Sequence, residues 1–131
     1  EERIDGRQFD MAAHLVHKDV EGKLAVVAVL LDRGSVQAVV QTVWNNLPLE
    51  KHQETKARVT IDLSQLLPAD RRYYTYMGSL TTPPCTEGVQ RVVMRHPVTM
   101  SPEQMDIFAR MYPTNSRPLQ AAHGRRILQS N

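Results

Sequence analysis

Cysteine and aromatic residues are both scarce in this sequence, and each shortage argues against a class of protein. Cys85 is the only cysteine among 131 residues, so no disulfide can close within the chain. It is a small buried residue, a free thiol, or one half of a bridge to a cysteine outside this chain. Aromatic residues make up 5% of the chain and follow no stacking pattern, while the basic residues are scattered. Both features argue against a nucleic-acid partner.

Long apolar runs are missing as well. No run approaches the roughly 20 residues that a membrane helix needs, so we expect no membrane partner. The chain opens on Glu1, without an initiator methionine and without a signal peptide. We therefore expect a processed or truncated N-terminus, in which case the missing signal does not decide the compartment.

The remaining composition is ordinary for one modest domain. Hydrophobic residues make up 41% and charged residues 23%, with a formal charge of +2. A chain of this length can bury a core, and it contains no internal repeat, linker or low-complexity segment.

Hydrophobic patterning predicts mostly strands in the first half. Residues 9–19 are typical of a strand closed by an Asp-containing turn, and 23–32 form a dense β-branched run typical of a buried strand. The two together predict a hairpin. Apolar residues at helical spacing predict a helix over 36–47, with Ser35 as N-cap. Residues 57–68 alternate in polarity and predict another strand, which runs into a turn.

The second half predicts two more strands and a helix. Residues 73–80 and 88–100 are typical strands that flank a proline-containing bend. A helix is predicted to start at Ser101 as N-cap, with Pro102 at its first position and Gln104 closing a capping box. The tail after this helix looks irregular. The predicted fold class is mainly β with short helices (α+β).

The bend between the last two predicted strands carries two adjacent hydroxyls followed by two prolines, in the stretch "LTTPPC". Proline locks its own φ and pushes the preceding residue toward an extended conformation. Thr82 is therefore held extended, and Thr81 lies just before a stiffened bend. An isolated TTPP is most often an ordinary strand exit, because proline and threonine are common in loops.

The five histidines do not fall into a metal-binding spacing. The sequence contains no HxH, no CxxC and no HExxH. His14 and His17 lie on opposite faces of a regular strand, so they cannot both reach one metal. The residue pattern alone therefore predicts a β-rich domain with an unexplained bend.

The order of the motifs adds a resemblance. The stretches "AHLVHKD", "GKLAVVAVLL", "YYTYMGSLTTPPCTEGV" and "MSPEQMDIFARMYPTNSRPLQ" follow one another along the chain. In this order and spacing the chain resembles the α-class carbonic anhydrases, and the bacterial members most closely, over essentially its whole length. "GSLTTPPCTEGV" and "NSRPLQ" are highly specific to that family. The resemblance implies part of the family's large, twisted, mostly antiparallel sheet, and the zinc-dependent hydration of carbon dioxide to bicarbonate and a proton.

The resemblance assigns roles to three residues. His14 matches the third zinc-binding histidine, Thr81 the threonine that gates the zinc-bound hydroxide, and Glu1 the glutamate that orients it. A hydroxyl has one proton to donate. If Thr81 donates that proton to an ionised Glu1, its oxygen can only accept from the hydroxide, which leaves a lone pair facing carbon dioxide. Zinc would lower the pKa of its bound water to about 7.

The resemblance also implies a substrate pocket. Leu80, Val16, Val26 and Val89 match positions where the family builds an apolar wall for carbon dioxide. Thr82, next to the gate, is placed to hydrogen-bond bicarbonate. The valines would be core residues in any β-protein, so they carry little weight alone.

Cys85 matches a cysteine that bacterial members pair with another near the N-terminus of the full-length protein. That pairing implies an oxidising compartment. We therefore expect a periplasmic or secreted protein whose signal has been removed.

The largest departure from the family is at the start of the chain. The HxH pair that supplies two of the three zinc ligands lies upstream in the family, and this chain begins after it. Residues 1–131 are thus expected to be the C-terminal portion of a single domain, without the upstream proton-shuttle region and part of the sheet. A catalytic zinc uses three protein ligands plus water, so the isolated chain is expected to be inactive.

Three substitutions also depart from the family. Ala12 stands where many members carry a glutamate that hydrogen-bonds the third histidine, and losing such a partner typically costs about 10–100-fold in metal affinity or activity. Arg91 replaces a tryptophan on the apolar wall. Glu2 replaces a histidine that often follows the orienting glutamate.

Two classes of function follow. The first is a zinc carbonic anhydrase acting on carbon dioxide and bicarbonate, which the matched residues Glu1, His14, Thr81 and Thr82 favour. The second is a metal-free binding or interaction module, which Ala12, Arg91 and the missing HxH pair favour. An incomplete sheet exposes strand edges, which would favour a homodimer or pairing with a separate N-terminal segment.

Overall fold

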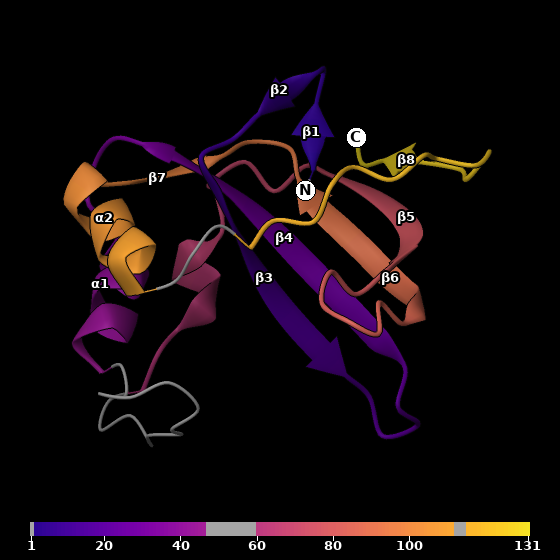
Figure 1. Cartoon of the computed structure of the whole chain (residues 1–131), viewed down its shortest axis with the longest axis horizontal. Helices are drawn as coiled ribbons and strands as arrows, with labels where there is room; N and C mark the ends of the chain where they lie inside the picture. The colour runs from indigo at the N-terminus through magenta and orange to yellow at the C-terminus, as the bar shows by residue number, and fades with distance from the viewer. Residues whose placement is uncertain (1, 47–59, 112–114) are drawn as a thin grey trace.

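The structure is a computed structural model that describes residues 2–46, 60–111 and 115–131. Its body is a six-stranded sheet (Figure 1). Five strands follow the order β3-β4-β6-β5-β8, and the sixth, β7, pairs with β4. A separate two-stranded ribbon is formed by β1 and β2. In chain order the elements are β1 (Arg3–Ile4), β2 (Arg7–Gln8), β3 (Met11–Lys18), β4 (Leu24–Arg33), α1 (Ala38–Asn45), the 3₁₀-helix η1 (Leu63–Leu66), β5 (Tyr73–Ser79), β6 (Glu87–Met94), β7 (Val98–Met100), α2 (Pro102–Met111) and β8 (Leu128–Gln129).

The predicted fold class, mainly β with short helices, is confirmed, and the sheet is mixed. Strand β4 pairs with β6 and β7 in parallel, whereas β3 with β4, β5 with β6 and β5 with β8 are antiparallel. The predicted hairpin is also confirmed, with β3 and β4 in register from Met11 opposite Leu31 to Lys18 opposite Leu24. The Asp19 carboxylate closes its turn by accepting from two backbone N–H groups.

Strand β4 is the centre of the core. Ala28, Val29, Leu30 and Leu31 are all at most 2% exposed, so this strand is covered on both faces. A continuous apolar run is the pattern expected of such a strand, because neither face of it meets water.

The two faces of the sheet are covered by different parts of the chain. On one face, Leu31 and Met100 pack with α1 and α2, which lie side by side in Figure 1. On the other face, Ala28, Leu30 and Val93 pack with Ile4 and with other residues, several of them from the N-terminal segment. This second face carries the candidate site.

The predicted capping box of α2 is confirmed. The Ser101 hydroxyl accepts from the Gln104 N–H at 3.2 Å, and the Gln104 side-chain oxygen accepts from the Ser101 N–H at 3.1 Å. Gln104 is 2% exposed and also bonds the backbone of Gln37. The box therefore anchors α2 to the start of α1.

Two predictions for the middle of the chain are wrong. The N-cap of α1 is Gln37 and not Ser35, because the Gln37 side chain accepts from the Val39 N–H at 2.7 Å. The predicted strand over 57–68 is absent from its described part, residues 60–68, where η1 forms instead. The Asp62 carboxylate accepts from the Ser64 N–H, and such a local bond competes with strand pairing.

The later strands also differ from the prediction. The expected strand over 88–100 is divided into β6 and β7 on either side of Pro97, which has no N–H to give to a ladder. The tail is not wholly irregular, since β8 pairs with β5 and the Ser130 hydroxyl accepts from the Tyr73 N–H at 2.8 Å.

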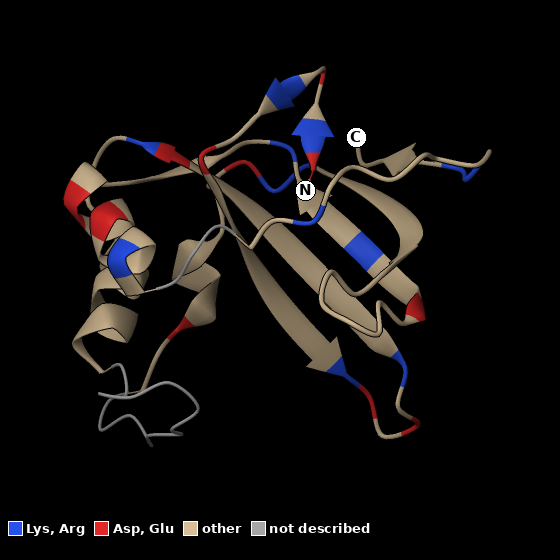
Figure 2. Cartoon of the chain, viewed as in Figure 1, with Lys and Arg blue, Asp and Glu red and all other residues tan. Residues whose placement is uncertain are grey.

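Lysine and arginine are spread over the strands, the hairpin turns and α2 in the described part of the chain, and acidic residues lie between them (Figure 2). None of the described helices is long and apolar enough to cross a membrane.

Candidate functional site

The sheet register places His14 and Arg91 on the same face. His14 of β3 lies opposite Ala28 of β4, and Arg91 of β6 lies opposite Val26 of β4. Side chains alternate along a strand, so Ala28 and Val26 share a face, and their partners share it with them. Arg91 is only 2% exposed and therefore points into the protein on the side of His14.

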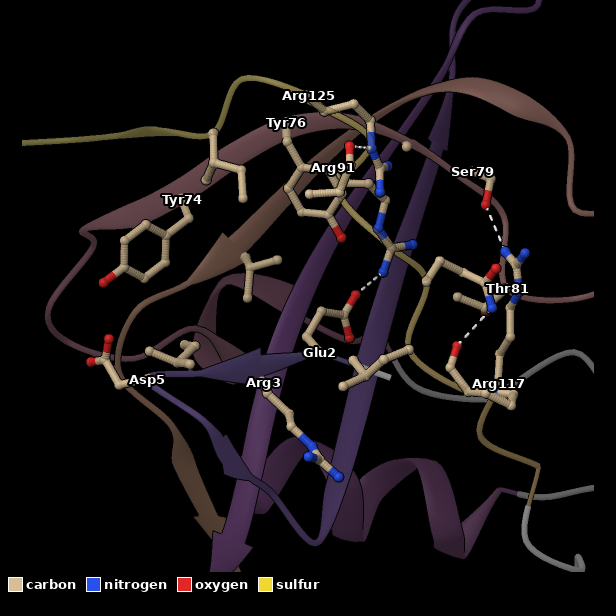
Figure 3. Close-up of a pocket in the computed structure, with 18 residues that line it drawn as sticks. Glu2, Arg3, Asp5, Tyr74, Tyr76, Ser79, Thr81, Arg91, Arg117 and Arg125 are labelled. Atoms are coloured by element: carbon tan, nitrogen blue, oxygen red, sulfur yellow. Dashed lines mark hydrogen bonds and ion pairs between the residues drawn. The ribbon is translucent and has the colours of Figure 1, made fainter.

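The N-terminal segment adds Glu2 to this pair. Glu2 Oε1 forms an ion pair with Arg91 Nη2, and Figure 3 shows the two side chains pointing toward each other. His14 Nε2 lies 3.7 Å from Glu2 Oε2 and 3.4 Å from Arg91 Nη2. The three side chains form a cluster that is largely shielded from solvent, with exposed side-chain fractions of 10% for Glu2, 3% for Arg91 and 18% for His14. We call it the Glu2–Arg91–His14 cluster.

The Glu2 carboxyl is ionised in this cluster. Burial by itself would raise its pKa, but the neighbouring His14 and the positive charge of Arg91 outweigh burial and lower the pKa from 4.5 to about 2. Glu2 therefore brings a negative charge to the ring of His14 at neutral pH.

The TTPP bend is held by backbone hydrogen bonds at both ends. The Leu80 N–H donates to the Thr86 carbonyl at 2.9 Å, and the Cys85 N–H donates to the Thr82 carbonyl at 2.8 Å. The peptide bond between the two prolines is cis. Thr81 is thus half-buried at the base of a closed loop, and Thr82 is exposed.

The stretch "NSRPLQ" supports the same loop from the C-terminal side. Arg117 Nη1 donates to the Ser79 hydroxyl at 2.9 Å and reaches the Leu80 carbonyl at 3.5 Å. Figure 3 shows Arg117 beside Ser79 and Thr81. The loop that carries Thr81 is therefore tied to the tail as well as to its own strands.

His14, Thr81 and Thr82 line one cavity of about 600 Å³, together with Glu2. Its wall includes side chains from both faces of β3, since Ala12 and His14 lie on one face and Met11, Ala13 and Leu15 lie on the other. The cavity therefore runs along an edge of β3. Among the described residues β3 pairs only with β4, so this edge is open.

The predicted apolar-wall residues lie on or near the same face but do not line that cavity. Val26 and Val89 are core residues, 1% and 0% exposed, whereas Val16 is 59% exposed and Leu80 is half-buried. Val16 lies opposite Val26, two residues along β3 from His14. Their role in binding carbon dioxide stays a prediction.

Glu1 lies outside the described residues, and so does its predicted contact with Thr81. Among the residues that are described, no group of three or more His, Cys, Asp or Glu side chains could hold a metal ion. His14 offers one imidazole, and the neighbouring Glu2 carboxylate is already paired with Arg91. The described residues therefore do not fit a complete zinc site by themselves.

The pairing of Glu2 with Arg91 was missed from the sequence. Both residues depart from the family pattern. Their opposite charges were a signal that the two departures belong together. The two residues are 89 positions apart in the sequence, and their contact is visible only in the folded structure.

Comparison with known proteins agrees with the motifs. A family model described as eukaryotic-type carbonic anhydrase matches residues 1–131. A carbonic anhydrase of Nostoc sp. is 42% identical over 133 residues, which cover 99% of this chain and 50% of that protein. A carbonic anhydrase of Klebsiella pneumoniae is 40% identical over 130 residues, which cover 98% and 53%.

A solved structure gives the same result. The alpha-carbonic anhydrase of Thermovibrio ammonificans, in complex with the inhibitor sulfanilamide, matches with a TM-score of 0.88 at 40% identity. The match covers 94% of this chain and 55% of that chain. The chain thus spans about half the length of the relatives that it matches.

Proposed function

Because the chain belongs to the eukaryotic-type, or α-class, carbonic anhydrase family, we propose that its parent protein is a zinc enzyme that interconverts carbon dioxide and bicarbonate. The observation that carries this proposal is the shared cavity of His14, Thr81 and Thr82, at an open strand edge. A metal-free binding module would have no need of an imidazole and two hydroxyls converging on one space.

His14 is the proposed metal ligand of this chain. Its Nε2 lies beside Glu2 and Arg91. Zinc, when bound, lowers the pKa of its water and so supplies a nucleophile at neutral pH.

We propose that two further histidines come from an HxH pair in a segment that precedes residue 1, and that residues 1–131 form the C-terminal portion of one domain. The cavity along the open edge of β3 supports this, because an additional strand could pair there beside His14. A strand with an HxH pair would present both imidazoles on one face.

Thr81 is the proposed gate. Its hydroxyl would donate its single proton to Glu1 and accept from the attacking oxygen, which orients a lone pair toward carbon dioxide. The hydrogen bonds of the loop and of Arg117 hold Thr81 in place, and a misplacement of about 1 Å can lower a rate about 100-fold. Thr82 would hydrogen-bond bicarbonate, and Leu80, Val16, Val26 and Val89 would form a dry wall.

Cys85 supports a proposed oxidising compartment. It is half-buried and forms no disulfide within the part of the chain that the structure describes. We propose that it pairs with a cysteine of the preceding segment, which places the protein in the periplasm or outside the cell.

The metal-free alternative is not favoured. Arg91 supported it because a charged side chain stands where the family has a tryptophan on the apolar wall. The Arg91 side chain is, however, buried and neutralised by Glu2. Its charge is therefore accounted for without a new ligand.

The experiment that tests the proposed function measures zinc by elemental analysis, and carbon dioxide hydration by stopped flow, on the natural full-length protein. We expect close to one zinc per chain and a hydration rate that a chelator abolishes and added zinc restores. A protein produced with zinc that retains none, and hydrates carbon dioxide no faster than buffer, would overturn the proposal.

A further inference from the structure

A second cavity lies against the sheet, bordered by the N-terminal segment and the C-terminal tail. Its volume is about 410 Å³, within the range of sites that hold small organic molecules. Its floor is the face of the sheet on which Tyr76 of β5 pairs with Arg91 of β6. Tyr74, two residues along β5, shares this face. In Figure 3 residues from both ends of the described chain surround this floor, among them Arg3 and Arg125.

The second cavity adjoins the cavity of His14 but has a different wall. Glu2 and Thr81 line both spaces. His14 and Thr82 line only the first, and Arg125 lines only the second. The second cavity is therefore a space to which the proposed function assigns no role.

Positive charge exceeds negative charge in the wall of the second cavity. Among the described residues, four arginines and two carboxylates line it. One arginine is neutralised, because Arg91 forms an ion pair with Glu2. The tail adds no acidic side chain, since the sequence after Asp106 contains arginine but neither aspartate nor glutamate. The wall therefore favours a negatively charged ligand.

Arg125 is the arginine best placed to hold such a ligand. Its Nε donates to the Ala122 carbonyl at 2.9 Å, its Nη2 to the Ala121 carbonyl at 3.0 Å and its Nη1 to the Met77 carbonyl at 3.1 Å. Its Cζ lies 5.5 Å from the centroid of the Tyr76 ring. These contacts fix the guanidinium, but neutral carbonyls do not cancel its charge. A guanidinium has five N–H donors, so one N–H on each terminal nitrogen remains for a ligand.

No carboxylate forms an ion pair with Arg125 within the part of the chain that the structure describes. Two parallel N–H donors on one guanidinium match the two oxygens of a carboxylate. The charge and the geometry of Arg125 therefore both fit a carboxylate ligand.

The rest of the wall is largely apolar, which defines the body of the ligand. Leu119 and Ile127 line the cavity and are 52% and 58% exposed, so they present apolar surface that a ligand can cover. Ile4 and the Tyr74 ring line it as well. The Asp5 carboxylate, also in the wall, repels a second negative charge. A single carboxylate on an apolar body fits this wall, whereas inorganic phosphate, which has no apolar part, fits it poorly.

We propose that the second cavity binds a small organic monocarboxylate. Its carboxylate accepts from the two remaining N–H groups of Arg125, and its apolar body lies against Tyr76, Leu119 and Ile127. The inference goes beyond the proposed function and does not depend on it, because neither a metal nor a reaction takes part in this binding.

The first test is a titration with benzoate, followed by carbon-13 NMR of the methyl groups. It uses the natural full-length protein after treatment with a chelator, so that no metal can bind the anion. We expect saturable shifts of the Leu119 and Ile127 methyl signals. Benzamide, which has the same shape without the charge, should bind about 5–10-fold more weakly.

Three outcomes of this titration would overturn the inference. The first is the absence of a saturable shift at Leu119 and Ile127, and the second is equal affinity for benzoate and benzamide. The third is an affinity for inorganic phosphate as high as that for benzoate, because the apolar wall would then contribute nothing.

The second test removes the charge of Arg125. Arg125→Gln should weaken benzoate binding about 5–10-fold in isothermal titration calorimetry, a modest factor because this arginine is exposed. Arg126→Gln is the matched control, since Arg126 is the next residue and is exposed but does not line the cavity. It should leave the affinity unchanged. Equal affinities of the two variants for benzoate would contradict the role of Arg125.

A third pair of variants guards against a simple disturbance of the tail. Ala122→Leu keeps every charge and adds a side chain to the cavity wall, so it should weaken benzoate binding at least about 5-fold. Ala121→Leu, at a neighbouring position outside the wall, should leave binding unchanged. If both variants bind benzoate as tightly as the wild type, the ligand does not occupy this cavity. A protein that binds benzoate here but hydrates no carbon dioxide would refute the proposed function and leave this inference intact.

Discussion

The Glu2–Arg91 pair makes the stability of the protein depend on pH in a way that a single substitution can isolate. Glu2 has its pKa lowered from 4.5 to about 2 in the folded protein. Each pKa unit corresponds to about 1.4 kcal/mol, so the ionised carboxylate contributes about 3 kcal/mol to folding. An estimate from charge removal agrees, because breaking one partner of a buried ion pair typically costs about 3–5 kcal/mol.

The sign follows from the direction of the shift. The folded protein holds the Glu2 proton less tightly than the unfolded chain does, so the contribution is fully present above pH 4.5. It is lost as the pH falls from there toward 2. Glu2→Gln removes the charge at every pH. The wild type should therefore be about 3 kcal/mol more stable than Glu2→Gln at pH 6–7, and the two should converge near pH 2.

The assay is urea unfolding of the metal-free natural protein, followed by far-UV circular dichroism at several values between pH 2 and 7. The other carboxylates contribute equally to the pH dependence of both proteins. The difference between the unfolding free energies of wild type and Glu2→Gln at each pH therefore reports Glu2 alone. Glu21→Gln should run parallel to the wild type, because the Glu21 side chain is 69% exposed. A constant difference between wild type and Glu2→Gln across this pH range would refute the reasoning, as would equal stability at pH 7.

The remaining predictions concern the site and its support. His14→Ala should lower bound zinc well below one per chain, measured by elemental analysis, because the site would lose a ligand. Thr81→Ala should lower kcat/KM for carbon dioxide about 100-fold in stopped-flow assays while zinc content stays the same, because the hydroxyl orients the attacking oxygen and binds no metal. Gly78→Ala should destabilise the protein by about 1–3 kcal/mol in urea unfolding, because a Cβ there would press on the Arg91 side chain at 3.0 Å. Ser101→Ala should reduce stability by about 1 kcal/mol through loss of the α2 N-cap, and an unchanged urea midpoint would contradict the capping role.

The fold was predictable where local pattern and tertiary packing agree. The β3–β4 hairpin and the capping box of α2 are encoded in short stretches, so the alternation and capping rules found them. The strand predicted over 57–68 failed in its described part because the Asp62 carboxylate bonds a nearby backbone N–H. Strand β8 was missed because two residues at the end of a polar tail carry no periodic signal.

The candidate site was predictable only in part. The resemblance identified His14, Thr81 and Thr82, and the structure brings these three to one cavity. It could not show that Arg91 turns toward His14, because a side chain's direction depends on the register of neighbouring strands. Nor could it show that Glu2, near one end of the chain, covers the same face.

The sequence by itself determined the family and the strand-rich class of this protein. Rare motifs such as "GSLTTPPCTEGV" indicate the family without a structure, and strand periodicity is a local property of the chain. Only the tertiary structure decided how the departures from the family fit together. Ala12, Glu2 and Arg91 looked like three separate losses along the chain. Strand β4 aligns β3 and β6 so that His14 and Arg91 share a face, and the N-terminal segment brings Glu2, 89 positions away in the sequence, into contact with Arg91 there.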